Sequence, residues 1–154
     1  MLIDASSAAD FAVARHLFQE YAAELDIDLC FQGFAAELDS LTSMYAPPAG
    51  CLLLARSGDR PMGCGAVRRL REDACEMKRL YVRPEARGTG LGKKLAAALV
   101  GRARVLGYAR MYLDTLAAMQ AARMVYRSLG FRETSAYYEN PLPAVVYMEL
   151  ELGS

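Results

Sequence analysis

Apolar residues recur at helical spacing in the first part of the chain. The capping pair Ser6-Ser7 comes before the first such stretch, and Asp10 follows Ser7 by three residues, as in a helix start. One helical face then collects Phe11, Ala14, Leu17, Phe18, Tyr21, Ala22 and Leu25. This spacing predicts an amphipathic helix ending near Leu25. Residues 26–50 predict a broken helical segment that closes at the turn-forming Pro47-Pro48-Ala49-Gly50.

The middle of the chain has the composition of strands. Strands are predicted at Cys51–Arg56, at Met62–Arg71 and at about Cys75–Val82. Residues 57–61 have turn composition and join the first two strands, and Pro84 marks the end of the third. The chain therefore places three consecutive strands after its helical first part.

Helices and strands alternate in the remainder. Glycines that follow the last periodic residue indicate helix ends. The predicted elements are a helix from about Gly90 to Leu106, a strand at Arg110–Asp114, a helix at Ala118–Leu129 and a strand at Ala144–Leu152. In the last strand Val146, Met148, Leu150 and Leu152 point to one face. The pattern predicts one α/β domain with a mixed sheet over residues 1–154.

The composition is that of a compact globular chain. Its 154 residues are 54% hydrophobic and 23% charged, which excludes disordered and fibrous classes. Lys plus Arg balance Asp plus Glu at 18 each, so the chain has no overall field to attract nucleic acid or an anionic membrane. The first residues lack a signal-peptide pattern, and no apolar stretch is long enough to span a membrane, so we expect a cytoplasmic protein.

Cysteine and histidine usage narrows the chemistry. Cys30, Cys51, Cys64 and Cys75 lie in apolar stretches without Cys-x-x-Cys spacing, which favours buried thiols over disulfides or a metal site. His16 is the single histidine, on a predicted helix. A Ser-His-Asp or Cys-His relay would need His16 itself, and a zinc site would lack ligands, so no metal is expected.

One junction combines glycines with basic residues. Gly88, Gly90 and Gly92 alternate between the end of a strand and the start of a helix. A helix start has unpaired N–H groups and the positive end of the helix dipole, and glycine lets a ligand approach the backbone. Arg87 and Lys93 add positive charge at the same place. The junction therefore predicts a site for a phosphate-bearing ligand.

Three phosphate-binding patterns can be compared with this junction. The P-loop fails at Arg87 and Lys94, and the dinucleotide fingerprint fails at Lys93. A third pattern, Arg/Gln-x-x-Gly-x-Gly/Ala, is met by Arg87, Gly90 and Gly92. Here the chain resembles the GNAT superfamily of acetyl-coenzyme A-dependent N-acyltransferases.

The resemblance extends beyond the glycine loop. Residues 110–115 look like the family's next strand, and residues 121–131 look like its following helix, with the ending Tyr-x-x-Leu-Gly-Phe. It covers roughly residues 50–152 by element order and about 78–131 by motif. The resemblance implies a central mixed, mostly antiparallel sheet with helices on both faces.

The resemblance also implies acetyl-coenzyme A as cosubstrate. In the family, loop N–H groups cradle the pyrophosphate, and the pantetheine pairs with the preceding strand like an extra strand. The residues that it assigns to the cofactor are Leu80, Tyr81, Val82, Arg87, Gly88, Thr89, Gly90, Leu91, Gly92 and Lys93. Many relatives carry asparagine seven residues before the helix tyrosine, whereas Met119 stands here and puts that polar contact in doubt.

Two residues are candidates for proton transfer. Tyr126 matches the family's general acid, which would protonate the departing thiolate; without the motif it would count as a buried structural tyrosine. Glu76 is the candidate base, placed by strand alternation on the same face as Leu80; it could equally be a solvent-facing glutamate. The implied direct transfer of the acyl group needs no covalent intermediate.

The acceptor amine is the least constrained part. Glu24, Phe31 and Tyr138 are candidate acceptor-site residues, but an acidic helix end, a core aromatic and a surface turn explain them as well. A small amine or amino acid is the first expectation, and a protein N-terminus or lysine is the second. The fold could also serve as an acetyl-coenzyme A sensor or partner module; a nucleotide-binding domain is a third alternative. A homodimer is compatible with the family.

Overall fold

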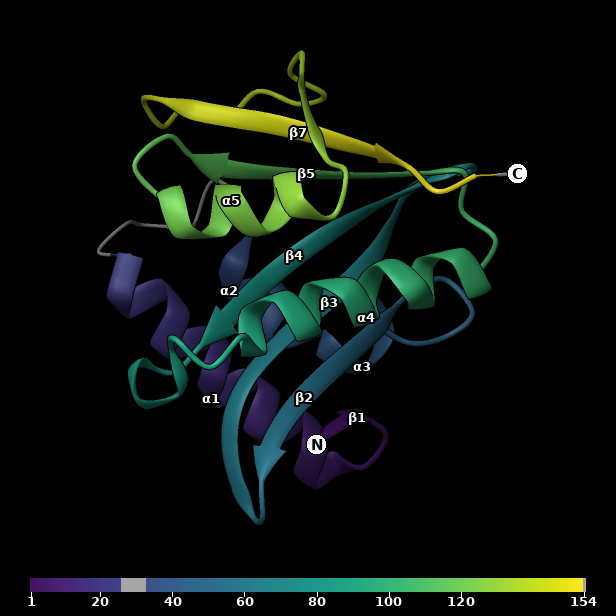
Figure 1. Ribbon diagram of the computed structural model, residues 1–154. Helices are drawn as coiled ribbons and strands as arrows, with labels where there is room; N and C mark the ends of the chain where they lie inside the picture. Colours follow the sequence, from purple (N-terminus) through teal and green to yellow (C-terminus); the bar gives the residue numbers. More distant parts are fainter. Residues whose placement is uncertain (26–32, 154) are drawn as a thin grey trace.

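Seven strands form one sheet in the computed structural model, which describes residues 1–25 and 33–153. The strand order is β1-β2-β3-β4-β5-β7-β6. The strands are β1 (Leu2–Asp4), β2 (Cys51–Ser57), β3 (Arg60–Arg71), β4 (Ala74–Val82), β5 (Arg110–Leu116), β6 (Arg132–Thr134) and β7 (Val145–Glu151). Strands β4 and β5 run parallel, and the other neighbouring pairs are antiparallel (Figure 1).

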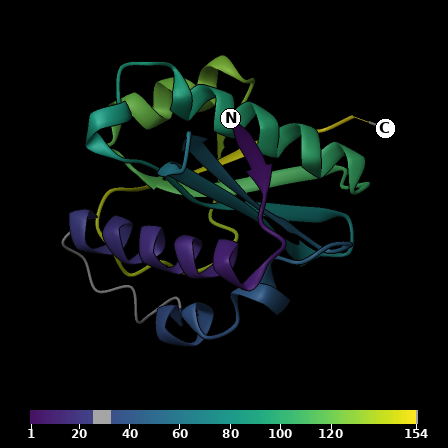
Figure 2. The same ribbon diagram turned by 90° about the horizontal axis from the view of Figure 1, so that it is seen from below.

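Helices cover both faces of this sheet, as Figure 2 shows. On one face lie α1 (Ala8–Leu25), α2 (Phe34–Leu38) and α3 (Leu41–Met44). On the other lie α4 (Leu91–Val105) and α5 (Gln120–Ser128). The mixed, mostly antiparallel sheet between helices that the family resemblance implied is confirmed.

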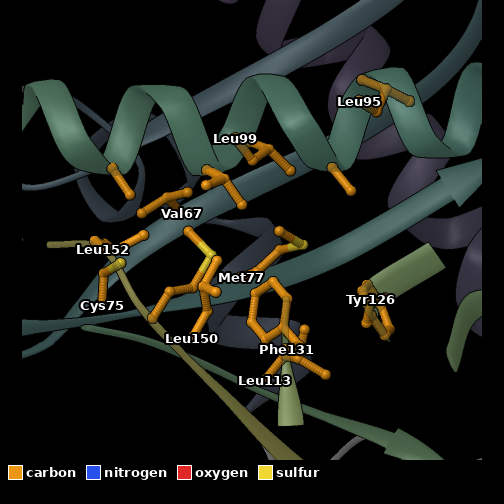
Figure 3. Packing of buried hydrophobic residues seen from close by; sticks show 14 of the residues in the cluster. Val67, Cys75, Met77, Leu95, Leu99, Leu113, Tyr126, Phe131, Leu150 and Leu152 are labelled. Atoms are coloured by element: carbon orange, nitrogen blue, oxygen red, sulfur yellow. The ribbon is translucent and has the colours of Figure 1, made fainter. Parts of the chain in front are cut away.

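Each face has its own hydrophobic core. Under α4, the fully buried Leu95 and Leu99 belong to one cluster with Val67 and Met77 of the sheet, and Tyr126 lies at one end of this cluster (Figure 3). Burying one such leucine contributes about 1.5–3 kcal/mol, so the core holds α4 at a set place on the sheet. The opposite core packs α1 through Ala14, Leu17 and Phe18. The start of α4 is thereby fixed beside the end of β4.

Most predicted elements are present with boundaries within a few residues. The turn between β2 and β3 is tighter than the predicted residues 57–61, because Ser57 pairs with Arg60 and leaves Gly58 and Asp59 as the turn. Strand β6 was not predicted. Its three residues, Arg132–Thr134, carry no apolar alternation, and they become a strand by pairing with β7.

The central pair of strands separates along its length. Strand β4 pairs with β5 only through Ala74–Glu76, although β4 continues to Val82 and β5 to Leu116. Figure 1 shows the two strands diverging from this short contact, with α5 beside the opening. The divergence leaves backbone N–H and C=O groups of both strands without partners across the gap, as on a sheet edge.

Candidate active site

Two adjacent hollows occupy the opening between β4 and β5. The larger, of about 640 Å³, lies between the end of β4, the glycine loop and the start of α5. The smaller, of about 60 Å³, lies in the gap itself. Four of the described residues line both hollows: Tyr21, Leu25, Leu80 and Met119. The two hollows therefore lie next to each other.

The glycine loop forms one wall of the larger hollow. After the 3-10 turn η2 (Pro84–Ala86), Gly88 and Gly90 have φ values of 81° and 82°, which favour glycine. A Cβ at either position would meet no atom within 4 Å, so the loop is open to solvent on that side. The first bond of α4 runs from the Lys94 N–H to the Gly90 carbonyl, at 3.1 Å.

The N–H groups of residues 91–93 precede that first bond and have no partner within the helix. They lie at the positive end of the α4 dipole beside an open cleft, which is an arrangement that binds anions. The loop thus fits the pyrophosphate of coenzyme A in shape and charge.

Nine of the ten residues assigned to the cofactor line the larger hollow: Leu80, Tyr81, Val82, Arg87, Gly88, Gly90, Leu91, Gly92 and Lys93. The exception is Thr89, whose hydroxyl donates to the Ala86 carbonyl at 2.6 Å. Thr89 therefore supports the shape of the loop. Met119, which replaces the family's asparagine, lines both hollows and gives them an apolar wall.

Arg87 is the charged residue of the loop motif, and its side chain forms hydrogen bonds to other residues of the protein. Its guanidinium donates to the Val82 carbonyl at 3.0 Å and to Glu24 Oε1 at 2.5 Å. Both side chains are nearly half exposed, and such a pair is worth about 0–1 kcal/mol. A phosphate can therefore compete for Arg87 at little cost. The structure places Glu24, a predicted acceptor residue, at the cofactor cleft, and Phe31 lies outside the described residues.

Tyr126 lines the smaller hollow from α5. Its side chain is buried, packs edge-on against Phe131, and has no hydrogen-bond partner among the described residues. Burial raises the pKa of Tyr126, with further contributions from Tyr21 and Asp114. The phenol therefore keeps its proton at neutral pH, as a general acid must before it acts.

A β-bulge interrupts β4 beside this hollow. Cys64 pairs with Tyr81, but two residues along β3 the partner of Ala66 is Lys78, so β4 contains one extra residue. Arg79, within the bulge, has φ 60°, which is uncommon for a residue with a side chain. In a regular strand, side chains alternate between the two faces of the sheet. The extra residue shifts this alternation, so residues an even number of positions apart on either side of the bulge point to opposite faces.

The inversion corrects the predicted position of Glu76. Glu76 pairs with Arg68 on the α1 side of the sheet, whereas Leu80 packs in the core under α4. The expectation that Glu76 and Leu80 share a face is wrong, because the bulge lies between them. Glu76 is also buried rather than solvent-facing, at 2% exposure.

Both carboxylate oxygens of Glu76 have partners. Arg68 Nε donates to Oε1 at 2.8 Å, and the Tyr137 hydroxyl donates to Oε2 at 2.5 Å. Glu76 is not among the residues that line the two hollows. Its role as a base stays a prediction, and it would require a relay.

Three charged residues that sequence reasoning missed line the smaller hollow. They are Lys78 and Arg79 of β4 and Asp114 of β5. Asp114 accepts hydrogen bonds from the Tyr138 hydroxyl and from Asn140 Nδ2. Tyr138, a predicted acceptor residue, thus orients Asp114, which lines the hollow. Lys78 could not be assigned to a face from sequence, because the bulge that orients it leaves no periodic signal.

The bulge is anchored by a buried ion pair. Arg79 donates to both oxygens of Glu37 at 2.9 and 2.7 Å, and the Tyr45 hydroxyl donates to the same carboxylate. Burial alone would raise the pKa of Glu37, but hydrogen bonds and charge from Arg79 outweigh burial and lower the pKa below its ordinary value. The pair connects α2 to the strained residue of β4.

We expect Glu37→Gln to lower the free energy of unfolding by about 3–5 kcal/mol, because Arg79 would remain buried with an uncompensated charge. Since the folded-state pKa is lowered, this stabilisation is present above the unfolded-state pKa of about 4.3 and is lost as pH falls through the folded-state value. Urea unfolding at pH 7 and pH 3 should show a large difference from the wild type that shrinks in acid. Asp39→Asn breaks the exposed pair with Arg15 and should cost about 0–1 kcal/mol. An equal effect of both variants would contradict the anchoring role.

The described cysteines are free thiols within the cores. Burial raises the pKa of Cys51 to about 11 and that of Cys75 to about 12, and Cys64 is fully buried. These thiols are therefore poor nucleophiles. Among the described residues no group of three or more potential metal ligands occurs. Within the same residues, no helix is both long and apolar enough to cross a membrane.

Comparison with known proteins gives a consistent result. The model of the acetyltransferase (GNAT) family matches residues 13–131. An uncharacterised N-acetyltransferase of Schizosaccharomyces pombe is 46% identical over 139 residues, which cover 89% of this chain and 85% of that protein. The Escherichia coli N-acetyltransferase YjgM is 33% identical over 77% of this chain and 72% of its own length.

Solved structures agree in fold. A Klebsiella pneumoniae protein described as an acyl-CoA N-acyltransferase is 31% identical, with a TM-score of 0.75 over 99% of this chain and 97% of that one. The Salmonella typhimurium acetyltransferase YncA, described with its cofactor acetyl-CoA, has a TM-score of 0.72 at 21% identity over 100% and 94% of the two chains.

Proposed function

This chain belongs to the acetyltransferase (GNAT) family, and we propose that it transfers the acetyl group of acetyl-coenzyme A to the primary amine of a small molecule or amino acid. The observation that carries the proposal is the adjacency of two hollows: the one beside the open glycine turn at the start of α4 shares Tyr21, Leu25, Leu80 and Met119 with the one lined by Tyr126. This adjacency supports a phosphate site and a proton donor that act on one ligand.

Bound acetyl-coenzyme A would supply an activated thioester. The N–H groups of residues 91–93 would hold its pyrophosphate, and Arg87 would exchange Glu24 for a phosphate. The unpaired edge of β4 at Leu80–Val82 would align the pantetheine by main-chain hydrogen bonds. N–H groups at the bulge are candidates to stabilise the oxyanion, because Arg79 already holds that backbone in place.

Two proton transfers complete the reaction. As the amine nitrogen bonds to the acetyl carbon and the carbon–sulfur bond breaks, Tyr126 would give its proton to the sulfur. The proton lost by the amine would pass to Glu76, with the Tyr137 hydroxyl as the first relay group, since it already donates to that carboxylate. Loss of turnover in Glu76→Gln at an unchanged affinity for acetyl-coenzyme A is the measurement for this role; unchanged turnover would exclude Glu76.

The function is tested by a thiol-release screen with acetyl-coenzyme A and a library of amines, amino acids and peptides. We expect amine-dependent release of coenzyme A with small acceptors. Turnover with peptides or proteins alone would instead identify a protein acetyltransferase. Binding of acetyl-coenzyme A, seen as a raised melting temperature, without release from any acceptor would indicate a sensor.

We further propose that the protein acts in the cytoplasm, where thiols stay reduced. The three free cysteines of the described residues support this.

A further inference from the structure

Opposite charges face the smaller hollow from the two strands of the gap. Lys78 is opposite Ala66, which belongs to the core on the α1 side of the sheet. Asp114 alternates with Leu113, which belongs to the core under α4, so Asp114 also points to the α1 side. Both residues line the hollow that contains Tyr126. A cation and an anion therefore flank the space next to the proposed acid.

Asp114 is held in a fixed position. The Tyr138 hydroxyl and Asn140 Nδ2 both donate to Oδ2. Asn140 also donates to the Tyr138 hydroxyl at 3.0 Å, so the three side chains support one another. No described residue donates a hydrogen bond to Oδ1. Within the part of the chain that the structure describes, one oxygen of Asp114 therefore remains available to an ammonium group.

Lys78 is a cationic side chain of this region whose neighbouring carboxylates are already paired with arginines. The two carboxylates whose charges act on it are Glu76 and Glu37, and each already has an arginine partner, Arg68 and Arg79. No ion pair of Lys78 occurs among the described residues. Burial lowers the pKa of Lys78, and the charge of Arg79 adds to this effect. A half-buried ammonium that has no ion-pair partner among the described residues is costly, and an anionic ligand would relieve that cost.

We propose that the acceptor is an α-amino acid, with its carboxylate bound by Lys78 and its amino group by Asp114. This rests on the proposed function and names the class of acceptor for the same site. An amino acid carries both charges on adjacent atoms, so one small ligand can pair with both residues. Tyr21, Leu25 and Leu142 are among the largely apolar residues that line the hollow, and they favour an uncharged, apolar side chain.

The test uses leucine, leucinamide and 3-methylbutylamine as matched acceptors with the full-length enzyme. We expect Lys78→Met to reduce kcat/KM for leucine by about 10- to 150-fold, the worth of one hydrogen bond to a charged group. The values for leucinamide and 3-methylbutylamine should stay within about twofold of the wild type. The three acceptors differ in basicity. For each acceptor, however, kcat/KM of the variant is compared with kcat/KM of the wild type, so the difference in basicity cancels. Lys78→Arg keeps the charge and should recover part of the activity toward leucine.

A binding measurement makes the result independent of turnover. Leucine is titrated calorimetrically into the protein–coenzyme A complex, and we expect binding by the wild type that Lys78→Met weakens by a similar factor. Equal losses for leucine and leucinamide, or wild-type binding by Lys78→Met, would overturn the inference. Failure of every amine to release thiol would contradict the proposed function, while the titration would still decide whether amino acids bind. Absence of amino acid binding to the wild type would overturn the inference even if other amines react.

Discussion

Tyr126→Phe is expected to lower turnover by roughly 10²- to 10⁴-fold while leaving the affinity for acetyl-coenzyme A unchanged. The substitution removes one hydroxyl from the hollow and keeps the ring that packs on Phe131. The protein should therefore stay folded and bind its cosubstrate. The loss falls on kcat because the thiolate would leave without a proton donor. Single-turnover release of thiol, with the chemical step rate-limiting, measures the effect.

The control is a tyrosine whose hydroxyl lies outside the two hollows. Tyr108 is buried at the opposite end of α4 and donates to the Ala49 carbonyl. Tyr108→Phe also removes a buried hydroxyl, in this case one that hydrogen-bonds to Ala49 and Arg69, so it reports on stability alone, and we expect near wild-type turnover. Unchanged chemistry in Tyr126→Phe would refute its role as an acid, and an equal loss in both variants would assign the effect to folding.

Gly90→Val is expected to weaken the binding of acetyl-coenzyme A by at least about 100-fold. The valine side chain would project into the open turn where the pyrophosphate is proposed to bind, and it would shield the N–H groups at the start of α4. Loss of even one or two hydrogen bonds to a charged phosphate, at about 1.5–3 kcal/mol each, accounts for this factor. Isothermal titration calorimetry of acetyl-coenzyme A is the measurement.

Backbone strain must be separated from this loss of contact. Gly90 has φ 82°, which a β-branched residue adopts only with strain. Gly58, in the turn between β2 and β3, has φ 62° and likewise meets no atom within 4 Å of an added Cβ. Gly58→Val should therefore cost similar stability and keep wild-type affinity. Wild-type affinity in Gly90→Val would show that the pyrophosphate does not bind at this turn.

Local features of this protein were predictable from its sequence. The apolar face of the helix from Phe11 to Leu25 and the alternation of the last strand are repeats of hydrophobic residues within a single element. Such repeats can be read directly from the sequence. The glycine turn is local as well, since Gly88 and Gly90 supply the positive φ values that the chain needs between η2 and α4. The residues predicted to bind the cofactor came from this motif and from the strand before it, and nine of the ten line one hollow.

The positions of the residues in the proposed acceptor site depend on tertiary structure. One extra residue at Arg79 inverts the alternation of β4, so Glu76 is buried behind Arg68 and Tyr137 and not on the face of Leu80. The bulge is stabilised by Glu37, which is distant in sequence and has no local signal.

Lys78 and Asp114 belong to different strands and meet at one hollow because β4 and β5 pair over only three residues before they separate. Periodicity within an element reports which face is buried. It carries no information on where two strands part or where a bulge shifts register, because those depend on packing between segments far apart in the chain.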